Sequence, residues 1–193
     1  MNEILISIQP KYVRDIVHEI KTLEIRKTRP KCDLPCKVYV YCTKNTKQYF
    51  NDIKCCESWM MDSDDLGKVI GEFTLNKIDQ YEEKDLFEGM DEISDSIVER
   101  RSRVWIDVLL KYKGDKEYLY GWNIDNFKRY DKSKELSEFG MLCMGESYWK
   151  CENCDYYYLE STEDGRYEEC LCNNIKPLKK APQDWCYVEE IKR

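Results

Sequence analysis

The hydrophobic pattern near the start of the chain changes period twice. Residues 4–9 alternate apolar with polar side chains except at Leu5, which predicts a strand covered on both faces near its start. A helical spacing follows Pro10, with apolar residues at Val13, Ile16, Val17 and Ile20. We therefore expect a strand followed by a short amphipathic helix.

The helix is predicted to run directly into a second strand. Leu23 and Ile25 fall on one side of this strand, whereas Glu24 and Arg26 fall on the other. Lys21 lies at the turn between helix and strand. Three ionisable side chains are therefore predicted to share one small space. A surface strand that carries a glutamate and an arginine by chance has the same pattern, so the pattern alone assigns no function.

Further elements follow from the same reading of periodicity. Pro30 and Pro35 bound a loop that carries Cys32 and Cys36. Strands are predicted at 37–43, 69–75 and 185–191, a strand or turn at 118–124, and an acidic helix-like segment at 79–99 that Gly89 interrupts. Residues 105–112 form a buried segment that is either helix or strand, and 131–139 are expected to be a connecting loop with a helical turn. The last strand is expected to complete a barrel by pairing with the early strands.

A cysteine-rich segment interrupts this pattern between residues 141 and 180. Two cysteine pairs, spaced C-x2-C and C-x-C, are separated by fifteen residues: Cys151, Cys154, Cys170 and Cys172. Zinc takes four such ligands in a tetrahedron, and four protein ligands leave no position for a catalytic water. Tyr156–Leu159 and Arg166–Glu169 are expected to pair across Asp164-Gly165, a hairpin turn signal. The segment therefore predicts a structural zinc knuckle, with free thiols, a disulfide or an iron–sulfur site as alternatives.

Composition restricts the class of protein. We interpret residues 1–193 as one domain, with 141–180 as an insertion, because no flexible linker divides the chain. With no signal peptide and no membrane-spanning run, a soluble cytoplasmic protein is expected, and its eleven cysteines are expected to be thiols or metal ligands. Cys32, Cys36, Cys55 and Cys56 fit no standard metal template. The net charge of -7 argues against non-specific binding of duplex DNA.

Motifs of common enzymes are absent from the sequence. The single histidine, His18, cannot form a His-pair metal site, and no nucleophile elbow, glycine-rich phosphate loop or deaminase signature is present.

Four early stretches and two late ones together resemble an ASCH domain of the PUA-like superfamily, as found in phage and bacterial proteins. They are I-L-I-S-I-Q-P-K-Y-V at 4–13, K-T-L-E-I-R-K at 21–27, K-V-Y-V-Y-C-T-K at 37–44, G-K-V-I-G-E-F at 67–73, Y-G-W-N-I at 120–124 and A-P-Q-D-W-C-Y-V-E at 181–189. The family signature is close to G-x-K-x-x-E-x-R. Lys21, Glu24 and Arg26 match it, and Glu19 stands in place of its opening glycine. The resemblance implies an α+β fold, a small β-barrel flanked by helices, here with the zinc-knuckle-like insertion.

The resemblance also implies a cleft that accepts RNA or a nucleotide-like ligand, often with a modified base. Unpaired bases are held by aromatic faces and by hydrogen bonds along their edges, and phosphates are held by cations. The residues predicted to bind the ligand are Ser7, Gln9, Tyr12, Lys21, Glu24, Arg26, Thr43, Lys44, Trp122, Gln183 and Trp185. Glu72 is expected to pair with Arg26 or Lys21.

Two other classes of function remain open. Some ASCH relatives are amidohydrolases of acetylated cytidine that use a lysine and a threonine from this junction, and others are reported as ribonucleases. Lys21 and Glu24 would be the catalytic residues of such an enzyme here, but Glu24 occupies the threonine position and a carboxylate replaces the hydroxyl poorly. A protein-interaction adaptor acting through the insertion or the acidic segment is the third class. We favour a binding module, because no activated nucleophile is visible.

Overall fold

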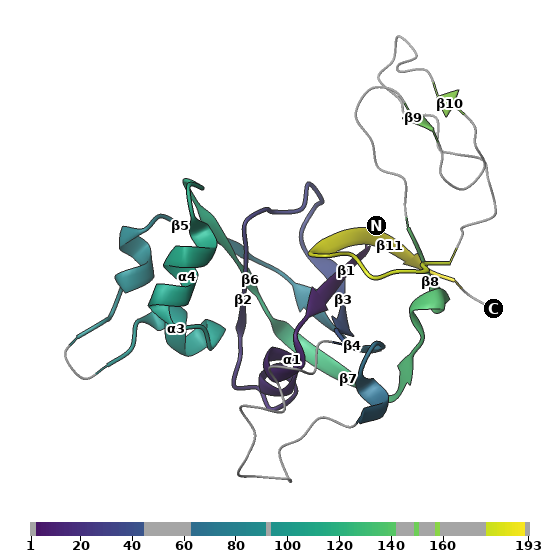
Figure 1. Cartoon of the computed structure of the whole chain (residues 1–193), viewed down its shortest axis with the longest axis horizontal. Helices are drawn as coiled ribbons and strands as arrows, with labels where there is room; N and C mark the ends of the chain where they lie inside the picture. The colour runs from purple at the N-terminus through teal and green to yellow at the C-terminus, as the bar shows by residue number, and fades with distance from the viewer. Residues whose placement is uncertain are drawn as a thin grey trace.

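The computed structural model describes residues 3–44, 63–91, 94–141, 149–150, 157–158 and 177–191. Within these ranges the chain forms a six-stranded mixed sheet and a three-stranded antiparallel sheet, with short helices in the connections (Figure 1). The predicted α+β class is confirmed. Of the helices in this part of the chain, none combines the length and the apolar character that crossing a bilayer requires.

The large sheet is built around the first strand. Its order is β7(Asp125–Lys134), β4(Val69–Leu75), β3(Cys36–Cys42), β1(Glu3–Ile8), β11(Trp185–Glu190) and β8(Phe139–Met141). β1 pairs with β3 in parallel and with β11 in antiparallel orientation, with Ile6 opposite Trp185. The predicted pairing of the last strand with an early strand is therefore confirmed.

The small sheet is joined to the large one by a nearly continuous strand. β6(Leu119–Asn123) lies between β2(Leu23–Arg26) and β5(Ile78–Tyr81). Ile124 alone separates β6 from β7, so the chain passes from the small sheet into the edge of the large one (Figure 1). A strand that changes sheets in this way forms a corner between them. The corner brings Trp122 of β6 over the inner face of the large sheet.

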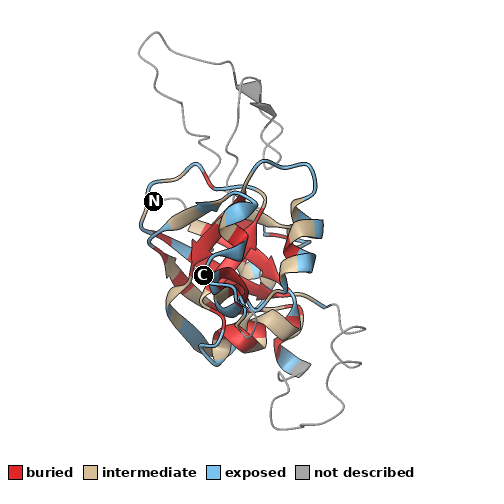
Figure 2. Ribbon diagram, turned by 90° about the vertical axis from the view of Figure 1, so that its left-hand side faces the viewer, coloured by how far each residue is buried: buried red, intermediate tan, exposed pale blue. Residues whose placement is uncertain are grey.

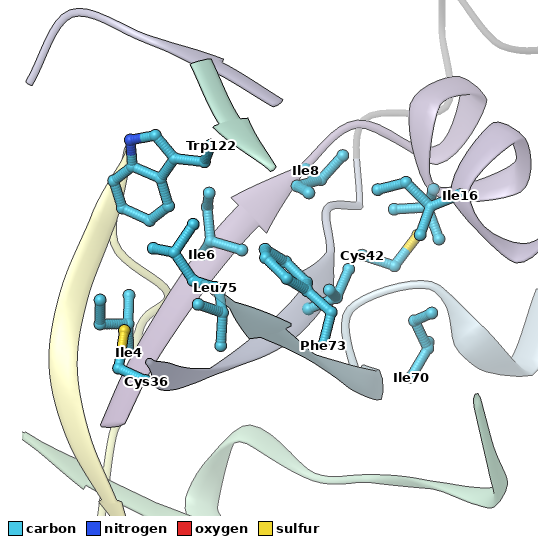
Figure 3. Close-up of a cluster of buried hydrophobic side chains, with 13 residues drawn as sticks. Ile4, Ile6, Ile8, Ile16, Cys36, Cys42, Ile70, Phe73, Leu75 and Trp122 are labelled. Atoms are coloured by element: carbon cyan, nitrogen blue, oxygen red, sulfur yellow. The ribbon is translucent and has the colours of Figure 1, made fainter. Parts of the chain in front are cut away.

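The core occupies both faces of the large sheet. Alternate residues of β1 enter different clusters, Ile4 and Ile6 on the inner face with Trp122, and Leu5 on the outer face with Tyr39. Figure 3 shows the inner cluster gathered from β1, β3, β4 and α1, and Figure 2 shows the buried residues in the middle of the molecule. This arrangement explains why three successive residues of β1, Ile4, Leu5 and Ile6, are apolar. The prediction that both its faces are covered is confirmed.

Among the described residues, three short α-helices lie beside the sheets. α1(Pro10–Val17) begins with the predicted proline and follows β1. α3(Ile97–Ser102) begins with a capping box in which Ser96 and Glu99 bond each other's backbone amides. α4(Ile106–Lys113) shows that the segment at 105–112, open between helix and strand, is a helix. The prediction that this segment is buried is wrong, because Trp105 and Val108 are exposed, whereas Leu109 of α4 is buried. α3 and α4 pack against the small sheet through a third apolar cluster that includes Leu23, Val98 and Leu109.

The sequence prediction for the segment at 79–99 is wrong, and the prediction for 131–139 is right only in its helical turn. The acidic segment at 79–99 contains β5, the 3-10 turn η3(Lys84–Phe87) and only the start of α3. Gly89 adopts φ 72°, a conformation that a continuous helix does not allow. At 131–139, β7 extends to Lys134 before the 3-10 turn η4(Leu136–Glu138). β7 is an edge strand with no buried residue, so it lacks the apolar alternation that marks a strand.

The cysteine-rich segment is described only in part. β10(Tyr157–Tyr158) pairs with β9(Trp149–Lys150), on the other side of the C-x2-C pair in sequence. The predicted pairing of Tyr156–Leu159 with Arg166–Glu169 involves residues that the structure does not describe. Residues 166–169 and the four predicted zinc ligands, Cys151, Cys154, Cys170 and Cys172, lie outside the described residues.

Candidate functional site

The turn between α1 and β2 positions the predicted charged side chains. α1 ends at Val17, and Glu19 adopts a left-handed backbone with φ 59°. The backbone amides of Ile20 and Lys21 then both donate to the carbonyl oxygen of Asp15, at 2.8 and 2.9 Å. Glycine adopts the left-handed conformation freely, whereas a residue with a Cβ pays for it. The resembled signature has a glycine at this position. In this chain Glu19 adopts the left-handed conformation that glycine adopts freely.

Lys21 is a buried cation whose protons are all engaged. The residue is 2% exposed, and its Nζ donates to the carbonyl oxygens of Leu23 at 2.8 Å and Ser102 at 2.5 Å. The same atom lies 3.1 Å from Glu24 Oε2. A lysine ammonium has three protons, and these three acceptors account for them. Burial lowers the pKa of Lys21, and the neighbouring Glu24 opposes that shift. Lys21 therefore holds Glu24 in place.

Arg26 connects Glu24 to the segment before β11. Its Nη2 lies 3.0 Å from Glu24 Oε1 and donates to the carbonyl oxygen of Ser7 at 2.8 Å, while Nη1 pairs with the carboxylate of Asp184. We call Lys21, Glu24, Arg26 and Asp184 the ion network. The structure thus brings the three predicted charged residues together and adds a fourth.

The ion network has a closed end and an open end. It alternates cation and carboxylate and is neutral as a whole, with each oxygen of Glu24 facing a different cation. The side chains of Lys21, Glu24 and Arg26 are 1%, 10% and 11% exposed, but that of Asp184 is 39% exposed. Arg26 Nε is buried without a hydrogen-bond partner in the part of the chain that the structure describes. A ligand would therefore approach from the Asp184 end.

The two predicted tryptophans differ in what they offer to a ligand. Trp122 is fully buried in the inner cluster, so its ring is part of the core. Trp185 is partly exposed and lies between Trp122 and Tyr187, with ring centroids 5.6 and 5.4 Å away. Its indole N–H donates to Thr28 Oγ1 at 3.0 Å. Of these two rings, Trp185 alone retains surface on which a base can stack.

Two tyrosines carry cations near the network. Lys21 Nζ lies 5.1 Å from the ring centroid of Tyr12, and Lys11 Nζ lies 4.6 Å from it. Lys27 Nζ lies 4.9 Å from the centroid of Tyr112, on α4. Burial raises the pKa of the Tyr112 phenol, and the charge of Asp184 raises it further. Tyr112 therefore lies beside Lys27, which directly follows Arg26 in sequence.

The other predicted contacts are placed unevenly. Ser7 belongs to the site, because its carbonyl accepts from Arg26 and its Oγ donates to the carbonyl oxygen of Pro182 at 2.7 Å. Gln9 and Gln183 are exposed, just before α1 and just before Asp184. Thr43 Oγ1 is buried without a partner among the described residues.

Lys44 and Glu72 lie away from the ion network. Lys44 lines a separate cavity of about 810 Å³ with Tyr41 and Leu178, and none of the network residues lines that cavity. The prediction that Glu72 pairs with Arg26 or Lys21 is wrong, because its carboxylate accepts from Tyr130 Oη at 2.6 Å. Glu72 stands opposite Tyr39 in the sheet, and the Tyr39 side chain belongs to the outer core cluster.

Three residues of the site were missed by the sequence analysis. Ser102 contributes a backbone carbonyl at the end of α3, which a sequence pattern does not reveal. Tyr112 was indicated only as part of a buried segment. Asp184 could have been predicted from the sequence, because it stands between the predicted site residues Gln183 and Trp185 in a segment of the family resemblance.

The cysteines described by the structure form no metal centre. Cys32 Sγ lies 3.6 Å from Cys36 Sγ, while Cys55 and Cys56 lie outside the described residues. Across the described ranges, no group of three or more histidine, cysteine, aspartate or glutamate residues is arranged to hold a metal ion.

Comparison with solved structures identifies the fold. No protein-family model matches the chain, and no curated protein matches it. The crystal structure of ASCH from Zymomonas mobilis superposes with a TM-score of 0.50 at 19% identity, covering 69% of this chain and 73% of that one. A mutant of the same protein gives a TM-score of 0.50 at 18% identity, covering 70% and 77%. The chain therefore has the fold of an ASCH domain, as its sequence motifs predicted.

Proposed function

We propose that this protein binds RNA or a nucleotide-like ligand at the open end of the ion network. Arg26 is the anion contact, and Trp185 is the stacking surface. The observation that carries the proposal is the pairing of Arg26, 9% exposed, with Asp184, whose side chain is 39% exposed. An inner cation is covered by an outer carboxylate that a ligand anion can replace.

Buried contacts preorganise the Arg26 guanidinium for binding an anion. Glu24 and the carbonyl of Ser7 fix Nη2, so the guanidinium needs little ordering when a ligand arrives. A phosphate matches the planar guanidinium fork and makes charge-assisted hydrogen bonds to it. In the proposed complex, a ligand phosphate takes the place of Asp184 at Nη1.

Stacking groups and the fold support a base-containing ligand. Trp185 borders Asp184 in sequence and is partly exposed, and Tyr12 and Tyr112 each carry a lysine over the ring. Aromatic faces hold unpaired bases by stacking. The ASCH fold supports the same class of ligand, because its resemblance to PUA-like domains implies RNA or nucleotide binding. The net charge of -7 favours a small or locally bound ligand over a long duplex.

The hydrolase alternative has less support. A general base needs a free lone pair within reach of the substrate. All three protons of Lys21 are engaged, and both oxygens of Glu24 face cations. This arrangement suits a scaffold for Arg26 better than a proton-transfer pair.

The test changes Asp184 and measures affinity for an anion. Asp184→Asn removes an exposed carboxylate that competes with the ligand for Arg26. The substitution should therefore tighten binding of ribonucleoside monophosphates about two- to fivefold, which corresponds to the free energy of an exposed ion pair. Arg26→Gln should weaken the same binding. Asp131→Asn on the edge strand β7 changes the net charge equally and should leave the affinity unaltered.

Product analysis in the same samples separates the alternatives. Labelled single-stranded RNA and acetylated cytidine are incubated with each variant, and products are measured together with binding. Turnover that Arg26→Gln abolishes would replace the binding module with an enzyme. Absence of both binding and turnover would leave the adaptor as the better account.

A further inference from the structure

The loop between β2 and β3, residues 27–35, carries a thiol that contacts a second thiol at the end of the loop. Cys32 Sγ lies 3.6 Å from the Sγ of Cys36, the first residue of β3. Both cysteines are free. Cys32 is partly exposed, whereas Cys36 is 6% exposed. A sulfur that solvent can reach is therefore in contact with a sulfur that is shielded from solvent.

The other two cysteines that the structure describes have different surroundings. Cys42 is fully buried, and its Sγ lies 3.9 Å from the carbonyl oxygen of Thr43. Cys186 packs against the outer core cluster, whereas Cys36 belongs to the inner one. Packing accounts for a single buried thiol, which behaves as a small apolar side chain. Packing leaves unexplained why a partly exposed thiol contacts a second thiol.

The geometry of the pair allows a disulfide. The sulfurs of a disulfide are about 2.0 Å apart, so these two must approach each other by about 1.6 Å. Cys36 is fixed in the large sheet, where it stands opposite Leu75 of β4. Cys32 lies in the loop between two exposed residues, Lys31 and Asp33. Movement of Cys32 toward Cys36 can therefore close the bond and leave the sheet in place.

We propose that Cys32 and Cys36 are an oxidation site that hydrogen peroxide converts into a reversible disulfide. In the first step Cys32 Sγ attacks the O–O bond, which breaks to give a sulfenic acid on Cys32 and one water molecule. In the second step Cys36 Sγ attacks that sulfur. The S–S bond forms, the S–O bond breaks, and the hydroxyl group leaves as water with the proton of Cys36. Two thiols are oxidised by two electrons, and one peroxide is reduced to two water molecules.

Burial assigns the two steps to the two cysteines. The thiolate is the reactive form of cysteine, and oxidation selects thiols that solvent can reach. Burial, followed by the hydrogen bond with Cys32, raises the pKa of Cys36 to about 12. Cys36 is therefore protected from direct oxidation, and Cys32 reacts first. The second step needs no access to solvent, because the two sulfurs are already in contact.

The same loop contacts the aromatic side chains of the candidate site. Thr28 Oγ1 accepts from the indole N–H of Trp185 at 3.0 Å, and the backbone amide of Lys31 donates to Tyr187 Oη at 2.7 Å. The Tyr187 ring in turn lies 5.4 Å from that of Trp185. Lys31 directly precedes Cys32, so movement of Cys32 into the disulfide alters these contacts. Oxidation therefore changes the surroundings of Trp185.

The test locates the disulfide by mass spectrometry. Reduced full-length protein is treated with hydrogen peroxide, unfolded in urea, blocked with N-ethylmaleimide and digested with trypsin. Trypsin cuts after Lys31 and Lys37, so the peptide 32–37 contains Cys32, Cys36 and no other cysteine. After peroxide this peptide should carry no label and weigh two hydrogen atoms less than the reduced peptide. Dithiothreitol added before the blocking step should restore both labels.

Three substitutions identify the reacting thiols. Cys32→Ser should abolish the disulfide. Cys36→Ser should stop the reaction at the sulfenic acid of Cys32, which dimedone traps. Cys186→Ser is the matched control, because it removes another partly exposed thiol, and it should leave the disulfide within 32–37 intact.

Tryptophan fluorescence tests the effect on the site. Peroxide should shift the emission of the unmodified chain, and both Cys32→Ser and Trp185→Phe should remove that shift. An unchanged emission with the disulfide formed would overturn the effect on Trp185 and retain the oxidation site.

Two results of the peptide analysis would overturn the proposal itself. One is a peptide 32–37 that still carries both labels after peroxide. The other is a disulfide that joins Cys32 to a cysteine outside this peptide. None of these measurements uses a ligand, so their outcome does not depend on the proposed function.

Discussion

At the scale of single residues, Lys21 is the centre of the site's stability. Its ammonium is buried and shared among Glu24 and two backbone carbonyls, so these acceptors depend on it. Lys21→Met keeps the length of the side chain but leaves a buried carboxylate without one of its partners. Breaking a buried ion pair in this way costs about 3–5 kcal/mol, and we expect that loss in the free energy of unfolding from urea titration.

The control for Lys21 is a lysine in an exposed pair. Lys37 lies 3.3 Å from Glu3 Oε1 with 41% of its side chain exposed, so Lys37→Met should cost no more than about 1 kcal/mol. Changing Lys21→Met and Glu24→Leu together should cost less than the sum of the two single changes, because each single change leaves the other member of the pair buried without its partner. Equal losses for Lys21→Met and Lys37→Met would contradict the role assigned to Lys21.

At the scale of elements, the end of α1 sets the direction of β2. Glu19 adopts φ 59°, which costs an L-residue roughly 1–2 kcal/mol that glycine avoids. Glycine loses more backbone entropy on folding, roughly 0.5–1 kcal/mol, so the net gain is smaller. We expect Glu19→Gly to raise the free energy of unfolding by up to about 1 kcal/mol, measured by urea titration.

Two further glycine substitutions show whether backbone conformation is the cause. Arg103 also has φ 59° at the end of α3, so Arg103→Gly should raise the free energy of unfolding as Glu19→Gly does. Lys111 is exposed inside α4, where glycine costs about 1 kcal/mol. A loss of stability in Glu19→Gly as large as that in Lys111→Gly would exclude relief of strain.

Local elements followed from periodicity wherever one face of the element is buried. β1, α1 and β2 were predicted because their apolar residues point into the core at the period of each structure. β7 was missed because its edge position leaves it without buried residues. Lys21, Glu24 and Arg26 were found because they lie within one turn and strand. Asp184 and Ser102 come from distant segments, and only the fold brings their oxygen atoms to Arg26 and Lys21.

At the scale of the whole molecule, the cysteine-rich segment leads to a prediction of metal content. Cys151, Cys154, Cys170 and Cys172 should hold about one equivalent of zinc, the content of a four-ligand structural site. Elemental analysis of protein purified without added metal measures this. Cys151→Ser should lose the zinc without unfolding the two sheets, which have apolar clusters of their own among the described residues. Less than about a tenth of an equivalent in the unmodified chain would rule out the site.

Buried thiols and phenols should make the whole molecule sensitive to alkali. Burial raises the pKa of Cys36 and Cys42 to about 12 and that of Cys186 to about 11. Burial also raises the pKa of Tyr39 and Tyr130, and a hydrogen bond to a carboxylate raises each further. In the unfolded chain, thiols lose their protons near pH 8.5 and phenols near pH 10.

The sign of the effect follows from proton binding. Above about pH 9 the unfolded chain holds fewer protons than the folded one, so the free energy of unfolding falls as pH rises. Each group contributes about 1.4 kcal/mol per pH unit between its unfolded and folded pKa values. Urea titrations from pH 7 to pH 11 should show little change from these groups up to pH 8 and a steep fall above pH 9. Tyr39→Phe keeps the ring and removes one titrating group, so the fall above pH 10 should be shallower by about 1.4 kcal/mol per unit. A flat profile to pH 11 would mean that these groups are open to solvent in the folded protein.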